Sequence, residues 1–205
     1  MNSASLAHLR KDPVLAGLIE RHGAIGLPPT RVSTFRSLAE AIVRQQLSQK
    51  AAAVILDRFR RLYPGKSFPT VGDVLATPPE RLREAGLSRA KAAYLLDLAM
   101  RVRQRRLPGL AACDRLPDEE LIARLTEVKG VGRWTAEMLL IFNLGREDVL
   151  PVDDLGVRRG FQRAHGWEAL PAAPELARHG ERWAPHRTTA ALYLWKAAGA
   201  ESATG

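Results

Sequence analysis

Apolar residues recur at intervals of three and four along almost the whole chain, a spacing typical of amphipathic α-helices. No stretch shows the sustained alternation of apolar and polar residues that predicts β-strands. Glycine and proline separate the helical segments, so the sequence predicts an all-α fold of many short helices. The predicted helices are Pro13–His22, Thr34–Leu47, Lys50–Leu62, Val71–Thr77, Pro79–Ala85, Arg89–Arg105, Asp118–Thr126, Thr135–Leu144, Leu155–Ala164, Ala173–Gly180 and Thr188–Ala198.

Short helices in series, without a repeat period or a low-complexity linker, are typical of a compact helical array. We expect the 205 residues to form a single helical unit with two lobes. One lobe is predicted over residues 36–125, and the other combines residues 1–35 with residues 126–205. A cleft between the lobes is the expected working surface.

The net charge is +9, from 31 lysines and arginines against 22 acidic residues. This balance favours a polyanionic partner such as nucleic acid, although many proteins with a similar positive charge bind no polyanion.

Cys113 is the sole cysteine, which excludes an intramolecular disulfide framework and a four-cysteine iron–sulfur cluster within the chain. No segment reaches the roughly 18 apolar residues of a membrane span. We expect a cytoplasmic monomer without membrane contact, nucleoid-associated in a bacterium.

The segment Leu125–Leu140 combines a polar helix end, a Gly-Val-Gly turn and the start of an apolar helix. Gly130 and Gly132 permit backbone conformations and close approaches that a side chain would block, so the amides that follow can face a phosphate. Val131 is expected to fill the space between the two helices. Taken alone, a Gly-X-Gly turn is more often a glycine-capped helix followed by an ordinary turn.

Two adjacent acids, Asp153 and Asp154, precede a basic amphipathic helix. A carboxylate in this position accepts hydrogen bonds from the amides of the first turn and complements the helix dipole. Both acids therefore suit a helix N-cap, and this role requires no catalytic function.

Two motifs carry a resemblance to the helix-hairpin-helix DNA glycosylases: Lys129-Gly-Val-Gly-Arg-Trp-Thr-Ala and Pro151-Val-Asp-Asp-Leu-Gly-Val-Arg-Arg. The chain specifically resembles the 3-methyladenine-DNA glycosylase II family, in a compact form without the N-terminal mixed α/β domain of larger members. The resemblance covers roughly Pro13 to Ala198. It implies base excision repair by a monofunctional glycosylase that flips alkylated bases out of double-stranded DNA and hydrolyses their N-glycosidic bond.

In that family the catalytic aspartate lies twenty residues after the hairpin tryptophan, which selects Asp154 here. The family also implies an aliphatic residue three positions later, and Val157 fits. Asp154 is expected to stabilise an oxocarbenium-like transition state. Asp153 remains a secondary candidate or a helix cap. Bifunctional members carry a lysine nucleophile where this chain has Trp134, so we expect no lyase activity.

The resemblance assigns further residues to DNA contact, and core packing or solvated charge is the alternative for each of them. Leu47 matches the family's intercalating wedge, and its neighbour Gln46 is expected at the opposite strand. Trp134, Trp195 and Met138 are predicted to line the base pocket, where aromatic faces attract a cationic base. The residues predicted for hairpin structure and phosphate binding are Lys129, Gly130, Val131, Gly132 and Arg133.

We expect no cofactor and no side-chain metal site, because the five histidines show no ligand spacing. The resemblance allows a monovalent cation bound by backbone carbonyls of the hairpin. Two alternatives stay open: a non-catalytic helix-hairpin-helix DNA-binding module, and a glycosylase for uracil, oxidised purines or mismatches. The Pro-Val-Asp-Asp turn argues against the first, while Trp134 and the missing cysteines argue against the lyase and iron–sulfur branches of the second.

Overall fold

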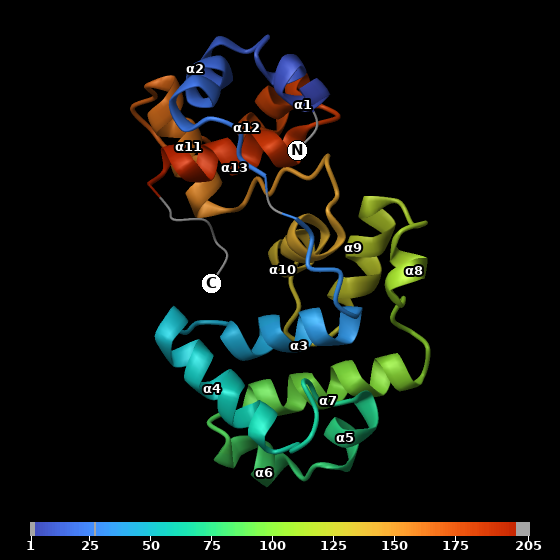
Figure 1. Ribbon diagram of the computed structural model, residues 1–205. Coiled ribbons are helices and arrows are strands. Elements are labelled where there is room, and N and C mark those ends of the chain that lie inside the picture. Colours follow the sequence, from blue (N-terminus) through green and yellow to red (C-terminus); the bar gives the residue numbers. More distant parts are fainter. Residues whose placement is uncertain (1–2, 27, 200–205) are drawn as a thin grey trace. The chain divides into compact units, whose positions relative to one another are not determined.

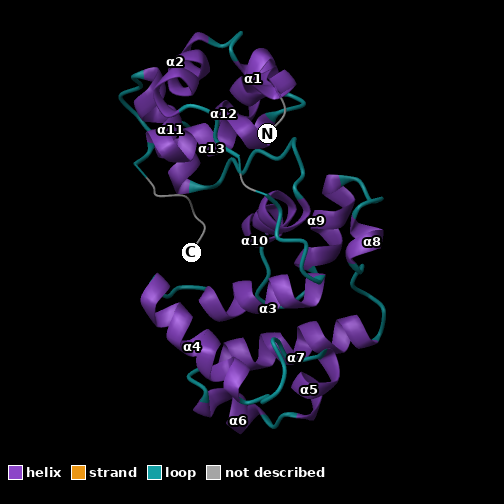
Figure 2. Ribbon diagram, in the orientation of Figure 1, coloured by secondary structure: helices purple, strands orange, loops and turns teal. Residues whose placement is uncertain are grey.

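The computed structural model describes residues 3–26 and 28–199, and all regular secondary structure in these ranges is helical (Figures 1 and 2). The all-α prediction is therefore confirmed. The helices are α1 (Ser3–Leu9), α2 (Pro13–His22), α3 (Thr34–Arg44), α4 (Gln49–Arg61), α5 (Val71–Ala76), α6 (Pro79–Glu84), α7 (Arg89–Arg103), α8 (Leu110–Cys113), α9 (Asp118–Thr126), α10 (Arg133–Met138), α11 (Leu155–His165), α12 (Ala173–Gly180) and α13 (Arg187–Ala197), with a π-helical turn η1 (Leu139–Leu144) and a 3-10 turn η2 (Glu181–Trp183).

Every predicted helix is present, with ends that agree to within a few residues. Three elements were not predicted. Helix α8 and turn η2 are too short to show helical periodicity, and α1 has the sequence Ser-Ala-Ser-Leu-Ala-His-Leu, in which only two residues are large and apolar. The helix predicted at Thr135–Leu144 begins earlier, at Arg133, and changes to π-helical geometry at Leu139. Within the described ranges, no helix combines the length and the apolar character that a membrane-spanning segment needs.

The chain divides into two units: unit 1 comprises Met1–Pro29 and Leu140–Gly205, and unit 2 comprises Thr30–Leu139. This division differs from the predicted lobes, because it groups the hairpin with the middle of the chain. The hairpin belongs to unit 2 because it contacts α7. The Lys129 amide donates a hydrogen bond of 3.0 Å to Asp97, and a Cβ added to Gly130 would lie 2.2 Å from the ring of Tyr94.

Unit 1 is built around α2, α11 and α13, which pack against one another. The approach of α11 to α13 is unusually close at Gly160, where an added Cβ would lie 1.8 Å from the carbonyl oxygen of Leu194. Trp183 and Tyr193 are fully buried in this unit, and the Tyr193 hydroxyl donates a hydrogen bond to the carbonyl of Gly23. These contacts join the segment after α2 to α13.

Unit 2 packs α3 against α4 and α7, and α5 against α7. The inner face of α3 is apolar, and Leu38, Ile42 and Val43 are completely buried. At the carboxyl end of α3, the ammonium group of Lys91 donates hydrogen bonds to the carbonyls of Val43 (2.8 Å) and Gln45 (2.6 Å). A side chain of α7 thus satisfies backbone carbonyls that a helix end leaves without intrahelical partners.

Candidate active site and DNA-binding hairpin

Asp154 is the N-cap residue of α11, and its side chain is half-buried. Its Oδ1 accepts a hydrogen bond of 2.7 Å from the amide of Val157. Of the two roles left open for Asp153, the structure excludes the helix cap: Asp153 is exposed and lies one residue before the cap. Extended backbone torsions at Asp154 direct its carboxylate back over the first turn of the helix, the geometry that capping requires.

Trp195 holds the same carboxylate oxygen from α13. Its indole Nε1 donates a hydrogen bond of 2.8 Å to Asp154 Oδ1, and its side chain is only 4% exposed. The indole stacks on Phe142, with ring centroids 5.8 Å apart. A Cβ added to Gly156 would lie 2.9 Å from the indole, so glycine permits the close approach of α11 to Trp195. The sequence analysis placed Trp195 near the base, but it did not foresee this hydrogen bond.

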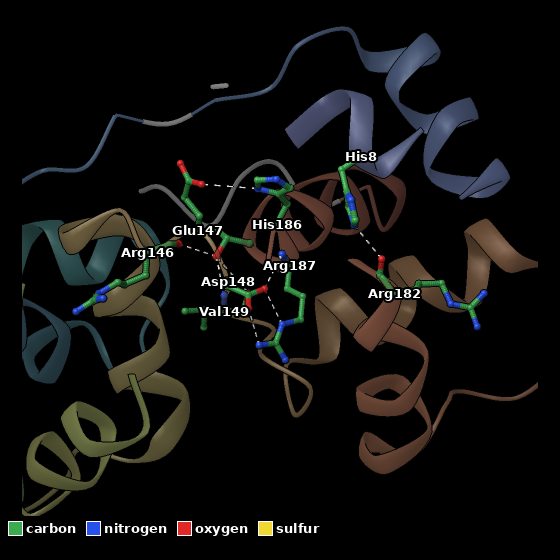
Figure 3. A network of polar contacts seen from close by, with 9 residues as sticks. His8, Arg146, Glu147, Asp148, Val149, Arg182, His186 and Arg187 are labelled. Carbon is green, nitrogen blue, oxygen red and sulfur yellow. Dashed lines mark hydrogen bonds and ion pairs between the residues drawn. The ribbon is translucent and has the colours of Figure 1, made fainter. Parts of the chain in front are cut away.

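The segment that leads to Asp154 is fastened to the start of α13 by the polar network drawn in Figure 3. Arg187 donates hydrogen bonds to both carboxylate oxygens of Asp148, at 2.7 and 2.9 Å. The Thr188 hydroxyl accepts from the amide of Val149 and donates to the carbonyl of Arg146. Burial acts to raise the pKa of Asp148, but the hydrogen bonds from Arg187 outweigh it and hold this pKa below its ordinary value. This network therefore joins the segment before Asp154 to the start of α13, and the hydrogen bond between Trp195 and Asp154 joins the same two parts of the chain a second time.

The predicted helix-hairpin-helix is formed by α9, α10 and the turn between them, within unit 2. Gly130 has a φ of +81°, which favours glycine, and Gly132 is the N-cap residue of α10. Val131 is buried, as expected for a residue between the two helices. Lys129 is exposed at the turn. The tertiary position of Gly130 requires glycine as well, because its Cα faces the ring of Tyr94.

Arg133 was predicted to bind phosphate, and its guanidinium group is engaged by two carboxylates. It donates to Glu119 at 2.9 Å and to Glu137 at 3.0 Å. Hydrogen bonding to Glu119 is the main reason that the pKa of Arg133 is raised above its ordinary value. A phosphate would therefore compete with these carboxylates.

On the same helix, Trp134 is 46% exposed and Met138 is half-buried.

The turn between α3 and α4 carries Gln46 and Leu47, both exposed. Leu47 lies beyond the end of α3 and is 36% exposed, so it is not part of the core. Gln46 has a φ of +56°, a conformation that few residues other than glycine adopt. The side-chain amide of Gln45 donates a hydrogen bond of 2.7 Å to the carbonyl of Gly130, which ties this turn to the hairpin. Sequence reasoning missed this link because the two residues are far apart in the chain.

Known proteins share this architecture. "DNA-3-methyladenine glycosylase 1" of Schizosaccharomyces pombe is 41% identical over 162 residues, which cover 79% of this chain and 71% of that protein. "DNA-3-methyladenine glycosylase 2" of Escherichia coli is 29% identical over 193 residues, covering 89% of this chain and 65% of that protein.

Two solved structures are similar over nearly the whole chain. A 3-methyladenine DNA glycosylase of Schizosaccharomyces pombe in complex with abasic DNA matches with a TM-score of 0.83 and 37% identity, over 95% of this chain and 96% of the other. A DNA-3-methyladenine glycosidase of Bacillus halodurans matches with a TM-score of 0.88 and 38% identity, over 97% and 90% of the two chains. The family model described as "HhH-GPD superfamily base excision DNA repair protein" matches residues 39–186. The chain therefore belongs to the HhH-GPD superfamily of base excision DNA repair proteins.

Proposed function

We propose that this protein is a monofunctional DNA glycosylase that releases alkylated bases of the 3-methyladenine type from double-stranded DNA. The names of its relatives support this substrate class. The observation that carries the proposal is the carboxylate of Asp154, which two N–H donors hold in a single orientation at the start of α11. We further propose that the protein acts as a cytoplasmic monomer.

Asp154 would act by electrostatic stabilisation. As the bond between the base and C1′ of the deoxyribose breaks, positive charge develops on the sugar, and a fixed carboxylate beside it lowers the energy of the transition state. Water then adds to C1′ and loses a proton, which leaves an abasic site and the free base. A base that is positively charged through alkylation departs as a neutral molecule and needs no general acid. Because Val157 and Trp195 already orient the carboxylate, little reorganisation is needed when the substrate arrives.

Unit 2 would hold the duplex. We propose that Leu47 enters the base stack in place of the flipped nucleotide, with Gln46 beside the opposite strand. The exposed indole of Trp134 offers an aromatic face to a cationic base. The hairpin turn would bind the DNA backbone, directly through Lys129 and the amides near Gly130 or through a monovalent cation at its carbonyls. The net charge of +9 supports binding to a polyanion.

We propose that the reaction stops at the abasic site. A lyase reaction proceeds through a Schiff base and needs a lysine nucleophile at the hairpin. This chain has Trp134 in the position that the family's bifunctional members give to lysine. The abasic strand should therefore remain uncut after the base has left.

The test measures the release of methylated purines from a methylated DNA duplex by the wild type, Asp154→Asn and Asp153→Asn. The three proteins are compared under conditions in which all are folded and bind DNA. We expect the rate of base release to fall about 100-fold or more in Asp154→Asn, because the positive charge that develops on the sugar loses the negative charge that stabilises it. Asp153→Asn should stay within about threefold of the wild type, because the exposed Asp153 does not cap α11. Failure of the wild type to release any base, despite tight DNA binding, would instead support a non-catalytic DNA-binding module.

A further inference from the structure

Three side chains that are distant in sequence converge within unit 1. Asp12 caps α2, His165 ends α11, and His179 lies in α12. Each offers one ligand atom, and these three atoms lie within 4.8 Å of one another. None of the three has a role in the glycosylase reaction proposed above.

Each of the two imidazoles has a buried nitrogen that the described residues leave without a hydrogen-bond partner. His165 Nδ1 lies 3.0 Å from the carbonyl oxygen of Phe161, which can only accept, so the proton is on Nδ1 and the lone pair is on Nε2. In the part of the chain that the structure describes, the buried Nε2 atoms of His165 and His179 have no hydrogen-bond partner. A buried polar atom without a partner is costly, and such an atom calls for an explanation.

The carboxylate of Asp12 is already fixed by its neighbours. Oδ1 accepts hydrogen bonds from the amides of Val14 and Leu15, and Oδ2 accepts one of 2.9 Å from the indole of Trp183. Oδ2 also lies 3.7 Å from His179 Nε2. Ligands of metal sites are commonly oriented in this way, with a histidine N–H on a backbone carbonyl and a carboxylate held by a second donor.

Both imidazoles have a pKa below the ordinary value of histidine. Burial is the main cause that lowers the pKa of His165 and of His179, and the nearby charge of Arg182 lowers both further. Asp12 opposes this lowering in both histidines, and the carbonyl of Phe161 opposes it in His165, but burial outweighs them. The neutral imidazole is the form that binds metals.

We propose that Asp12, His165 and His179 form a binding site for a divalent transition-metal ion, with zinc as the favoured occupant. Two imidazole nitrogens and one carboxylate oxygen are a common donor set for zinc. Tetrahedral zinc at its usual bond lengths needs ligand atoms about 3.4 Å apart, so separations of up to 4.8 Å must close by at most about 1.4 Å. This proposal differs from our expectation of no side-chain metal site. That expectation considered only the spacing of the histidines along the sequence.

A surface hollow adjoins the cluster at His179. His179 is 18% exposed and lines a surface hollow together with Trp167, Glu175, Arg178 and Arg182. Water in this hollow would complete the coordination. The bound ion would tie the start of α2 to the end of α11, the helix that Asp154 caps at its other end. Its effect would be structural, because it holds together the unit that carries the proposed catalytic carboxylate.

The test uses full-length protein freed of metal by a chelator and titrated with Co²⁺, then with Zn²⁺. We expect one equivalent of Co²⁺ to produce visible d–d absorption that Zn²⁺ abolishes, together with a higher Tm in Zn²⁺ than in chelator. His165→Gln and His179→Gln should each weaken binding at least about tenfold. His186→Gln is the matched control: His186 Nδ1 also lies 3.7 Å from a carboxylate, that of Glu147, but it belongs to no three-ligand group in the described residues.

Binding that is unchanged in both His165→Gln and His179→Gln, or lost equally in His186→Gln, would overturn the proposal. Far-UV circular dichroism establishes whether each variant is folded. If both cluster variants fail to fold, the wild-type titration decides, because a wild type without Co²⁺ absorption and without a Zn²⁺-dependent Tm has no such site. None of these measurements depends on base release, so the outcome is independent of the proposed glycosylase activity.

Discussion

The indole Nε1 of Trp195 donates a hydrogen bond of 2.8 Å to Oδ1 of Asp154. This contact joins α13 to the N-cap residue of α11. Trp195 is therefore a positioning residue in the proposed mechanism: it acts on the orientation of the carboxylate. Its aromatic body also packs on Phe142, so the hydrogen bond and the packing must be separated by experiment.

Trp195→Phe keeps an aromatic ring and removes the N–H donor. We expect base release under single-turnover conditions to fall about 10- to 100-fold, because the carboxylate loses its fixed orientation, while DNA affinity changes little. Trp167→Phe is the control, since Trp167 is 41% exposed and its ring packs edge-on against Phe161. An unchanged rate in Trp195→Phe, with normal folding, would show that the hydrogen bond does not position the carboxylate.

Asp154 has two separable roles, as helix cap and as proposed catalytic group. Asp154→Ala should lower the free energy of unfolding by about 1 kcal/mol, because the amide of Val157 loses its acceptor. Asp154→Asn keeps an oxygen acceptor and should unfold close to the wild type, although base release is lost in both variants. Urea denaturation measures the stabilities. Equal stability of the two variants would contradict the capping role.

Gly160 is required by the contact of α11 with α13. Gly160→Ala places a methyl group against the backbone of Leu194, where the carbonyl oxygen would lie 1.8 Å from Cβ, so we expect a loss of about 3 kcal/mol or more. Gly17→Ala is the matched control inside α2, because a Cβ there meets no atom within 4 Å. It should stabilise the protein by about 0.5–1 kcal/mol through helix propensity. Thermal and urea unfolding compare the two variants.

Lys91 supports the turn that carries Leu47. Lys91→Met removes the donor that serves the carbonyls of Val43 and Gln45, so we expect a loss of about 1–3 kcal/mol in stability and weaker binding to DNA that contains an abasic site. Lys50→Met removes the same charge from an exposed position near the same turn. Equal DNA affinities of the two variants would indicate that only charge matters at Lys91.

The buried imidazoles predict a pH dependence for the metal-free protein. Burial lowers the pKa of His165 and His179 below the ordinary value of 6.5, so the unfolded chain binds more protons than the folded one just below that pH. Their neutral forms stabilise the fold fully above pH 6.5, and this contribution falls as the pH drops towards the folded pKa. Urea unfolding in chelator should therefore show a decline below about pH 6.5. The decline should be smaller in the double variant His165→Gln, His179→Gln.

Local sequence patterns were sufficient for most of the fold. The 3.6-residue periodicity and the glycine and proline breaks located helices such as α2 and α9 with their observed ends, because amphipathic spacing and capping are local properties. Helices of one turn, such as α8, leave no periodic signal. The hairpin was also predictable, since its glycines occupy a turn of fixed length between two recognisable helices.

The choice between Asp153 and Asp154 shows where local reasoning ends. Both acids precede α11, and propensity for an N-cap does not separate adjacent positions. The resemblance to the family, which places its aspartate twenty residues after the hairpin tryptophan, implied Asp154 as the catalytic candidate, and the backbone of the folded chain makes that same residue the cap. The hydrogen bond from Trp195 then depends on the packing of α13 against α11.

The sequence by itself determined the helical class, the hairpin, and the adjacent pair of acids that contains the proposed catalytic residue. Only the tertiary structure decided which distant side chains meet: Trp195 with Asp154, Gln45 with Gly130, and Asp12 with two histidines. The physical reason is that periodicity specifies which face of a helix is buried, but not which residues it will contact. Those neighbours depend on how closely the helices approach, as Gly160 permits against Leu194, and that distance is a property of the whole packed core.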